Sequence, residues 1–356
     1  MAVKPYFAKK KRMILVLVCN ILCTFAVKIK MKKGLLAIGC WLLAIGAQAQ
    51  ESKEVYSFLR LPVSAHAAAV GGENISMIED DPTVIFHNPA LINNVTPMSM
   101  NLNFMTYMQG TTTASASFVK TAGQRGAWGA CAQYMSYGSI KETTVSNEQT
   151  GTFSPKDIAL AGTFAYMLND KISGGITARF ISSTIGSYSS AAVAFDLGVN
   201  YYHEEKGWSL SAVAKNLGGQ IKAYDEDFER IPFDLQVGFT KKLTGSPLTL
   251  HATLSRLNNW DQGFIKHLAV GADIYLGEMI YIAAGYNFRR SSEMKIIADG
   301  DEKGSNHGAG LSLGAGLQLQ RFKLQLAYAK YHVSASSLLV NVTYSLYENL
   351  GKPRIA

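Results

Sequence analysis

The sequence predicts an all-β protein, namely a transmembrane antiparallel β-barrel of about 14 strands with a short N-terminal plug. Three observations support this prediction. The chain begins with an export signal, its later part alternates apolar residues with small or polar ones, and the segments between the alternating stretches are by turns short and long. We divide the chain into a leader at 1–49, a plug at 50–97, a barrel at 98–347 and a tail at 348–356.

The leader contains a secretory signal peptide at 31–49. Met31-Lys32-Lys33 forms its basic start, an apolar stretch follows, and Ala47-Gln48-Ala49 is a cleavage site of the small-x-small type. These three parts in this order define such a signal. We interpret residues 1–30 as an extension from an upstream start codon. The alternative is a membrane anchor at 13–27, although this stretch is shorter than a spanning helix.

The leader also accounts for the positive charge of the chain. The full sequence has 34 Lys and Arg against 26 Asp and Glu, and nine of the basic residues lie at 1–49, where no acidic residue occurs. The remainder has 25 basic residues and a net charge of −1, so nothing in its charge favours nucleic-acid binding. Only Cys131 remains after cleavage behind Ala49, which excludes an intramolecular disulfide. Lipidation at Cys40 is the alternative way of processing the leader.

Strict alternation is clearest at 308–319. Every second residue from Gly308 to Gln318 is small or polar, and the residues between them are Ala or Leu. A period of two places the two sets on opposite faces of a strand. Most segments of this kind are near ten residues long, the length that a tilted strand needs to cross a bilayer. The predicted strands are 98–108, 111–120, 126–137, 157–168, 171–184, 189–202, 208–216, 231–242, 247–256, 264–276, 279–289, 308–319, 322–332 and 336–347.

The connections between these strands fall into two sets. Tight turns are predicted at 168–171, 244–246, 277–278 and 320–321. Longer polar loops are predicted at 138–156, 217–230, 257–263 and 290–307. Short turns in the periplasm and long loops at the cell surface are typical of outer-membrane barrels. We therefore expect an outer-membrane protein with its long loops outside and both termini in the periplasm.

A soluble β-sandwich is the alternative, because its strands also alternate. The polar faces of a sandwich would carry many Lys, Glu and Arg, whereas here they carry Gly, Ala, Ser, Thr and Asn. Small residues suit a crowded lumen. Surrounding hydrocarbon also explains the apolar faces without a second sheet to cover them. These points favour the barrel.

Residues 50–97 do not alternate and are predicted to form a compact plug inside the barrel. The small residues at 64–72 favour a helix that ends at a glycine pair. Asp80 and Asp81 precede a proline and mark a turn, and Asn88 and Pro89 mark another. These four residues are the plug motif of the sequence.

No motif predicts catalysis, a metal site or a cofactor site. The seven His residues show no metal-ligand spacing, and His251 and His267 lie on predicted strands, where a hydrogen bond in the lumen explains them. The acidic segment at 299–304 resembles the start of a calcium loop but has Lys303 at a ligand position. Asp80 and Asp81 could act as paired carboxylates, but turn chemistry accounts for them. We find no set of nucleophile, base and orienting group.

The plug region resembles the N-terminal hatch of the FadL-like outer-membrane proteins. The resemblance rests on the segment Ala65 to Gly72, the pair Asp80-Asp81 and the segment Asn88-Pro89-Ala90-Leu91. In that family, a small-residue helix, an acidic pair and Asn-Pro-Ala precede a barrel of 14 strands. Further segments along the chain look like the PorQ-type barrels of the type IX secretion system of Bacteroidota. They are Tyr56 to Pro62, Met105 to Gly110, Ala214 to Gly219, Tyr286 to Arg290 and Lys330 to Ser337.

This second resemblance implies a non-enzymatic anchor in an outer-membrane attachment complex. In that complex, PorQ-type barrels hold the surface protein PorZ, beside PorU and PorV, and the complex releases cargo and links it to lipopolysaccharide. The candidate partner contacts are Tyr224, Phe228, Arg289 and Arg290, in or beside two long loops. The alternative is a channel for hydrophobic small molecules of the FadL type, which needs an apolar pocket and an opening in the wall. A secreted hydrolase is disfavoured because no site for it was found.

Overall fold

The computed structural model describes residues 54–108, 110–146, 148–260, 263–295 and 307–347. The predicted leader at 1–49, the calcium-like segment at 299–304 and the tail at 348–356 lie outside these ranges. Among the helices of the described ranges, none is both long and apolar enough to cross a membrane.

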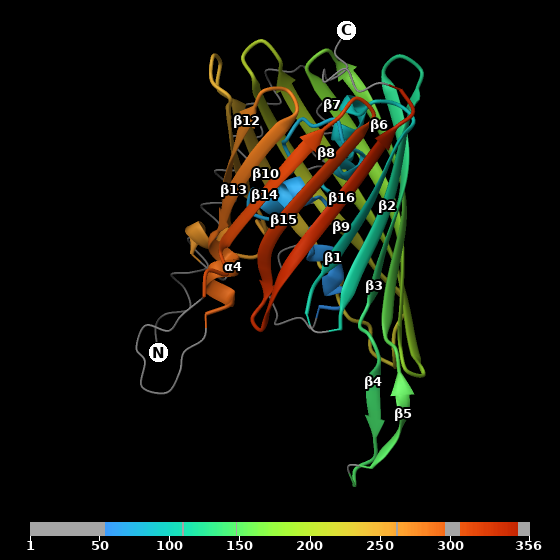
Figure 1. Cartoon of the computed structure of the whole chain (residues 1–356). Coiled ribbons are helices and arrows are strands. Elements are labelled where there is room, and N and C mark those ends of the chain that lie inside the picture. Colours follow the sequence, from blue (N-terminus) through green and yellow to red (C-terminus); the bar gives the residue numbers. More distant parts are fainter. Residues whose placement is uncertain (1–53, 109, 147, 261–262, 296–306, 348–356) are drawn as a thin grey trace, which may run out of the picture. The chain divides into compact units, whose positions relative to one another are not determined.

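The described strands form one closed antiparallel barrel of 14 strands (Figure 1), which confirms the predicted fold class. A further pair, β4 (Ile140–Thr143) and β5 (Gln149–Phe153), forms a separate hairpin. The barrel strands are β1 (Ser99–Thr106), β2 (Thr112–Ala122), β3 (Gly126–Ser136), β6 (Lys156–Asn169), β7 (Ile172–Ile185), β8 (Tyr188–His203), β9 (Trp208–Lys222), β10 (Asp234–Lys242), β11 (Leu248–Leu254), β12 (Leu268–Leu276), β13 (Ile280–Asn287), β14 (Leu311–Gln318), β15 (Phe322–His332) and β16 (Ala335–Ser345).

Pairing of β1 with β16 closes the barrel. Small polar side chains on the inner face reinforce this seam: Ser99 Oγ lies 2.6 Å from Ser345 Oγ, and Asn101 Nδ2 donates to Thr343 Oγ1 at 2.8 Å. Closure matters because a membrane offers no hydrogen-bond partner to an unpaired strand edge. Polar residues in alternate positions of the first and last strands therefore serve the closure itself.

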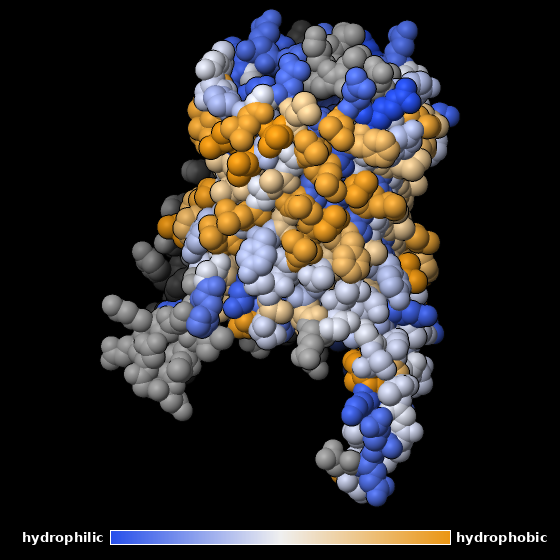
Figure 2. Space-filling view, in the orientation of Figure 1, coloured by the Kyte–Doolittle hydropathy of each residue, from blue (hydrophilic) through white to orange (hydrophobic). Residues whose placement is uncertain are grey.

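The two faces of each strand differ as the alternation predicts. On β14, Leu311 and Leu313 are exposed on the outer face, whereas Ser312 and Gly316 are buried on the inner face. Figure 2 shows an apolar band across the visible face of the barrel, with hydrophilic residues on both sides of it. Exposed large apolar side chains on an entire strand face, such as Leu102 at 65% on β1, are stable only against hydrocarbon.

The connections separate into a turn end and a loop end. At the turn end all described connections are short. At the loop end lie the long connections 137–155, 223–233, 255–267 and 288–310, beside short connections at 107–111, 186–187 and 333–334. The loop end is thus less uniform than the sequence suggested, because three of its hairpins have short connections.

Several predicted boundaries differ from the observed ones. Residues 217–222, predicted as loop, continue β9, and 264–267, predicted as strand, form the 3₁₀ turn η4 (Phe264–His267). The predicted strand at 279–289 ends at Asn287, where α4 (Phe288–Glu293) begins. The Asn287 side chain accepts a bond from the Arg290 N–H, and this N-cap turns an alternating pattern into a helix.

The plug occupies the barrel interior as four short helical pieces, η1 (Ser57–Arg60), α3 (Ala65–Ala69), η2 (Pro82–Phe86) and η3 (Pro89–Asn94). Ser64, Asp81 and Asn88 each cap the piece that follows, through bonds from backbone N–H groups 2.9–3.2 Å away. Proline at the first position of η2 and η3 suits a helix start. In Figure 1, these blue and teal pieces lie within the ring of strands.

Glycines on the inner wall make room for the plug. A Cβ at Gly175 of β7 would lie 2.5 Å from the carbonyl carbon of Pro89, and one at Gly285 of β13 would lie 2.2 Å from that of Val70. Both distances are far below van der Waals contact. The glycines that the sequence places on the inner face are therefore seats for the plug backbone.

We expect Gly175→Ala to destabilise the barrel by about 1–3 kcal/mol, because the added methyl group forces η3 away from the wall. The measurement is the melting temperature of the purified protein in detergent. Gly162→Ala on β6 is the matched control, since a Cβ there meets nothing within 4 Å. Equal melting temperatures for the two variants would contradict the seating role.

Candidate functional site

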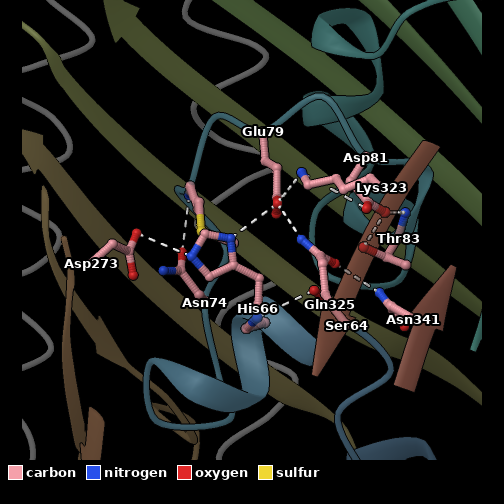
Figure 3. Close-up of polar contacts among 12 residues, drawn as sticks. Ser64, His66, Asn74, Glu79, Asp81, Thr83, Asp273, Lys323, Gln325 and Asn341 are labelled. Atoms are coloured by element: carbon pink, nitrogen blue, oxygen red, sulfur yellow. Dashed lines mark hydrogen bonds and ion pairs between the residues drawn. The ribbon is translucent and has the colours of Figure 1, made fainter. Parts of the chain in front are cut away.

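A network of buried charged groups joins the plug to the wall (Figure 3). His66 lies on α3, and Glu79 lies on the plug segment that leads to η2. Their partners project inward from the wall: Asp273 from β12 and Lys323 from β15. All four residues are at least nine-tenths buried. Isolated charges in such surroundings would be very costly, so their pairing determines whether the plug can stay inside.

Glu79 is the centre of the network. Its Oε1 atom accepts bonds from His66 Nδ1 at 3.0 Å, from Gln325 Nε2 at 2.7 Å and from Lys323 Nζ. Lys323 Nζ also lies 4.0 Å from Asp81 Oδ2. One carboxylate of the plug therefore accepts bonds from the plug helix α3 and from the barrel wall.

Asp273 is the second anionic centre. Its Oδ2 lies 3.1 Å from His66 Nε2 and accepts a bond from His251 Nε2 at 2.8 Å. Burial lowers the pKa of His66, but the carboxylates of Asp273 and Glu79 outweigh this effect and raise it to about 10. His66 is therefore protonated at neutral pH. The cations of His66 and Lys323 then pair with the anions of Glu79 and Asp273.

None of these four residues lines a described cavity. The network is buried and pairs charges of the plug with charges of the wall, and we refer to it as the lock between plug and wall. Among the described residues, no group of three or more His, Cys, Asp or Glu side chains could hold a metal ion.

A second buried cluster lies where β8 and β9 lose regular pairing. The register shifts between Phe195 and Leu197, opposite Asn216, whose φ is +56°. Arg179 of β7 donates to Asn216 Oδ1 and to Asp196 Oδ2, both at 2.7 Å, and Asp196 also accepts from the Asn216 N–H. This irregular stretch of wall is therefore filled by a paired polar cluster. The cavity beside it has a volume of about 40 Å³, enough for one or a few waters.

A larger cavity of about 240 Å³ lies at the loop end, between the plug and the barrel mouth. Its basic side chains are Arg60, Arg256, Arg289 and Arg290, and its acidic ones are Glu73 and Glu293. Aromatic and apolar groups complete the lining: Phe58, Leu61, Tyr107, Met108, Met135, Tyr137, Met294 and Tyr331. The N-cap at Asn287 starts α4 directly after β13, and this places Arg289 and Arg290 in the lining of the cavity.

The structure places the residues of the plug motif in supporting roles. Asp81 caps η2 and accepts a bond from Thr343 of β16 at 2.9 Å, and Asp80 accepts from Thr96. Asn88 caps η3, and Pro89 is its first residue. The two aspartates thus bind different segments and do not act as a pair.

The four candidate partner contacts divide into exposed and buried residues. Phe228 is 66% exposed in the connection 223–233, whereas Tyr224 is half-buried and donates to Ser183. Arg289 and Arg290 are 9% and 6% exposed and lie inside the mouth. Only Phe228 of the four is thus well placed to touch a large partner directly.

Sequence reasoning missed most of the lock. It expected hydrogen bonds in the lumen for His251 and His267, and both are buried and bonded, although His267 lies on η4 and not on a strand. His66, Glu79 and Lys323 were not singled out. Charged residues at inward positions of otherwise small-residue strands, such as Lys323 and Asp273, were the available signal.

We expect Lys323→Met to destabilise the barrel by about 3–5 kcal/mol, because it leaves Glu79 buried beside fewer donors. Unfolding in denaturant, followed by the heat-dependent shift on gels, provides the measurement. Adding Glu79→Gln should restore part of the loss. Lys120→Met, at an exposed position on β2, is the control. If the network does not stabilise the protein, Lys323→Met will lower the stability no more than Lys120→Met does.

No known protein family matches the chain, and no curated protein matches it either. Solved structures do. The toluene transporter TodX of Pseudomonas putida shares 11% identity with it over 82% of this chain and 100% of its own, with a TM-score of 0.53. A TodX mutant described as a monoaromatic hydrocarbon channel shares 13% identity with it over 79% of this chain and 97% of its own, with a TM-score of 0.54. A FadL homologue of Pseudomonas aeruginosa shares 13% identity with it over 81% of this chain and 99% of its own, with a TM-score of 0.48. Identities this low concern the fold alone, and the fold of this chain is similar to that of the TodX barrel.

Proposed function

We propose that this chain is a non-enzymatic outer-membrane barrel that holds a surface protein at its loop end. The observation that carries the proposal is the locked plug, which fills the lumen with backbone seated on wall glycines and with paired buried charges. Removing this plug for transport would break several buried ion pairs at once. A barrel built in this way is better suited to carrying a partner than to opening a path.

The loop end offers a contact surface for such a partner. The β4–β5 hairpin extends beyond the barrel (Figure 1), and its strands are almost wholly exposed. A two-stranded hairpin without a packed face is marginally stable in water by itself. Its free edges and the exposed Ile140 and Phe228 can pair and pack with another protein.

The partner proposed is PorZ, with PorU and PorV in the same attachment complex, as the resemblance of the sequence to PorQ-type barrels implies. In this proposal the turn end faces the periplasm and the loop end faces the cell surface. The sequence predicted both termini in the periplasm, whereas Glu54, at the start of the described plug, pairs with Arg230 in the loop-end connection 223–233. The barrel itself performs no chemistry. Its partners release the cargo and attach it to lipopolysaccharide.

A channel for hydrophobic small molecules is the second candidate, favoured by the likeness to TodX, a toluene transporter. Such a channel needs an apolar pocket and an opening in the wall. The irregular wall stretch at Asn216 is the place for an opening, but Arg179 and Asp196 fill it. The adjoining cavity of about 40 Å³ is too small for a monoaromatic ring, since a cavity that binds benzene measures about 150 Å³.

Affinity purification of the tagged barrel from outer membranes tests the anchor. We expect a surface protein to co-purify with the unmodified chain and to be lost when residues 141–152 are replaced by Asn-Gly, which removes the hairpin. Replacing the turn-end connection 243–247 by the same dipeptide is the control, and it should retain the partner. Recovery of the partner with the hairpin variant would show that the hairpin does not hold it. Absence of any surface protein from the unmodified sample would refute the anchor.

Liposomes containing the purified barrel test the channel. We expect toluene to enter these liposomes no faster than it enters liposomes that contain the heat-denatured protein, because the lumen is filled and polar. The variant Arg179→Leu with Asp196→Leu removes the cluster at the irregular wall stretch and shows whether that stretch can be opened. Rapid entry through the unmodified barrel would favour the channel over the anchor.

A further inference from the structure

The outer face of β6 carries a lysine at its loop end, directly beyond an apolar row. The outward residues of this strand are Lys156, Ile158, Leu160, Gly162, Phe164, Tyr166 and Leu168. From Ile158 to Leu168 the chain rises about 33 Å along the strand, or about 25 Å across the membrane for a strand tilted by roughly 40°. This height matches the apolar band of an outer-membrane barrel. Lys156 therefore lies at the level of the lipid headgroups, at the loop-end edge of the hydrocarbon.

The register of the sheet brings a second lysine to the same height. Lys156 pairs with Thr184 of β7, and Thr184 pairs with Ser189 of β8. Lys222 of β9 donates from Nζ to Ser189 Oγ at 2.6 Å. Neighbouring strands lie about 4.8 Å apart, a distance that the flexible four-carbon stem of Lys156 can span. Both ammonium groups can therefore reach a ligand that lies over the hydroxyl groups of Thr184 and Ser189.

Acidic groups do not neutralise these two lysines. Among the residues that the structure describes, no carboxylate oxygen lies within 4.0 Å of Lys156 Nζ or Lys222 Nζ. Asp157 follows Lys156 in the chain but lies on the inner face, where it accepts bonds from Tyr137 and Ser183. The two exposed cations thus lie on the outer face beside hydroxyl groups, without an anion of the protein.

The outer surface between these lysines and the turn end is apolar. Leu160 pairs with Phe180, and Phe195 pairs with Ala178 on the same wall. The side chains of Leu160, Phe180 and Phe195 are 44–53% exposed. A lipid can therefore place its acyl chains along this wall while its headgroup lies on the lysines and hydroxyl groups. A phosphate monoester carries a charge of about −1.5 to −2 at neutral pH, which matches two ammonium groups better than the single charge of a phosphodiester does.

We propose that Lys156 and Lys222, with Thr184 and Ser189 between them, bind the phosphate monoester of a membrane lipid. The ammonium groups form charge-assisted hydrogen bonds to the phosphate oxygens, and the hydroxyl groups donate to the same oxygens. The inference rests on the proposed function only for the leaflet: with the loop end at the cell surface, the lipid belongs to the outer leaflet. Lipid binding itself does not require the surface partner, so the outcome of the affinity purification does not decide it.

Native mass spectrometry of the purified full-length barrel in a neutral detergent tests the site with phosphatidic acid as the probe. We expect one phosphatidic acid to bind roughly tenfold more tightly than phosphatidylcholine with the same acyl chains, because only the monoester offers two negative charges. Lys156→Gln with Lys222→Gln should weaken the binding of phosphatidic acid by roughly tenfold. Lys120→Gln with Lys171→Gln removes the same charge from exposed positions of the turn end and should leave the binding unchanged.

Three results would overturn the proposal. They are equal binding of phosphatidic acid and phosphatidylcholine, equal weakening by the loop-end and turn-end double variants, and displacement of phosphatidic acid by an equal concentration of inorganic phosphate. The last result would assign the lysines to free phosphate and not to a lipid. Melting temperatures of the double variants equal to that of the unmodified protein show that they are folded. If the loop-end double variant does not fold, Lys222→Gln alone serves in its place, and unchanged affinity for phosphatidic acid in this variant would also refute the assignment.

Discussion

The absence of hydrogen-bonding solvent in a bilayer shapes every level of this molecule. Backbone groups must pair with one another, so the sheet closes on itself through β1 and β16. In the closed barrel, the outward-pointing residues of each strand contact hydrocarbon. The residues between them point into the lumen and are small or polar. The small polar residues that result, such as Ser99 and Asn101, then bond across the seam. The constraint on the backbone thus determines the chemistry of the lumen.

A lumen of small residues creates a second requirement, because the space must be filled. The plug fills it with helical pieces seated on glycines of the wall, among them Gly175 and Gly285. Short helices have many unpaired backbone groups, and side-chain caps from Ser64, Asp81 and Asn88 satisfy some of them. The plug is thus not a loose insert, and its register against the wall is set residue by residue.

Charge pairing adds specificity to this packing. Glu79 would be very costly in the lumen without the donors from β15, and Lys323 would be equally costly without the plug. Neither element is therefore stable in its observed form without the other.

The sequence alone determined the architecture of this protein. A two-residue period, maintained from strand to strand, places apolar residues toward hydrocarbon and small or polar residues toward the lumen. The barrel, its strands and its inner small residues could therefore be predicted from the sequence. Local chemistry also predicted the turns at Asp81 and Asn88, because capping depends on neighbours in the chain. Strand ends were less certain: alternation continued past Asn287, and only the N-cap at Asn287, whose side chain accepts from the Arg290 N–H, reveals that a helix begins there. Tertiary structure decided which inward groups meet. Residues 66, 79, 273 and 323 are far apart in the sequence, and no local pattern relates a plug carboxylate to a wall lysine 244 residues later. Likewise, the sequence places Arg289 at the end of a predicted strand and Arg290 at the start of a predicted loop, and their burial follows only from the fold of the barrel mouth around them.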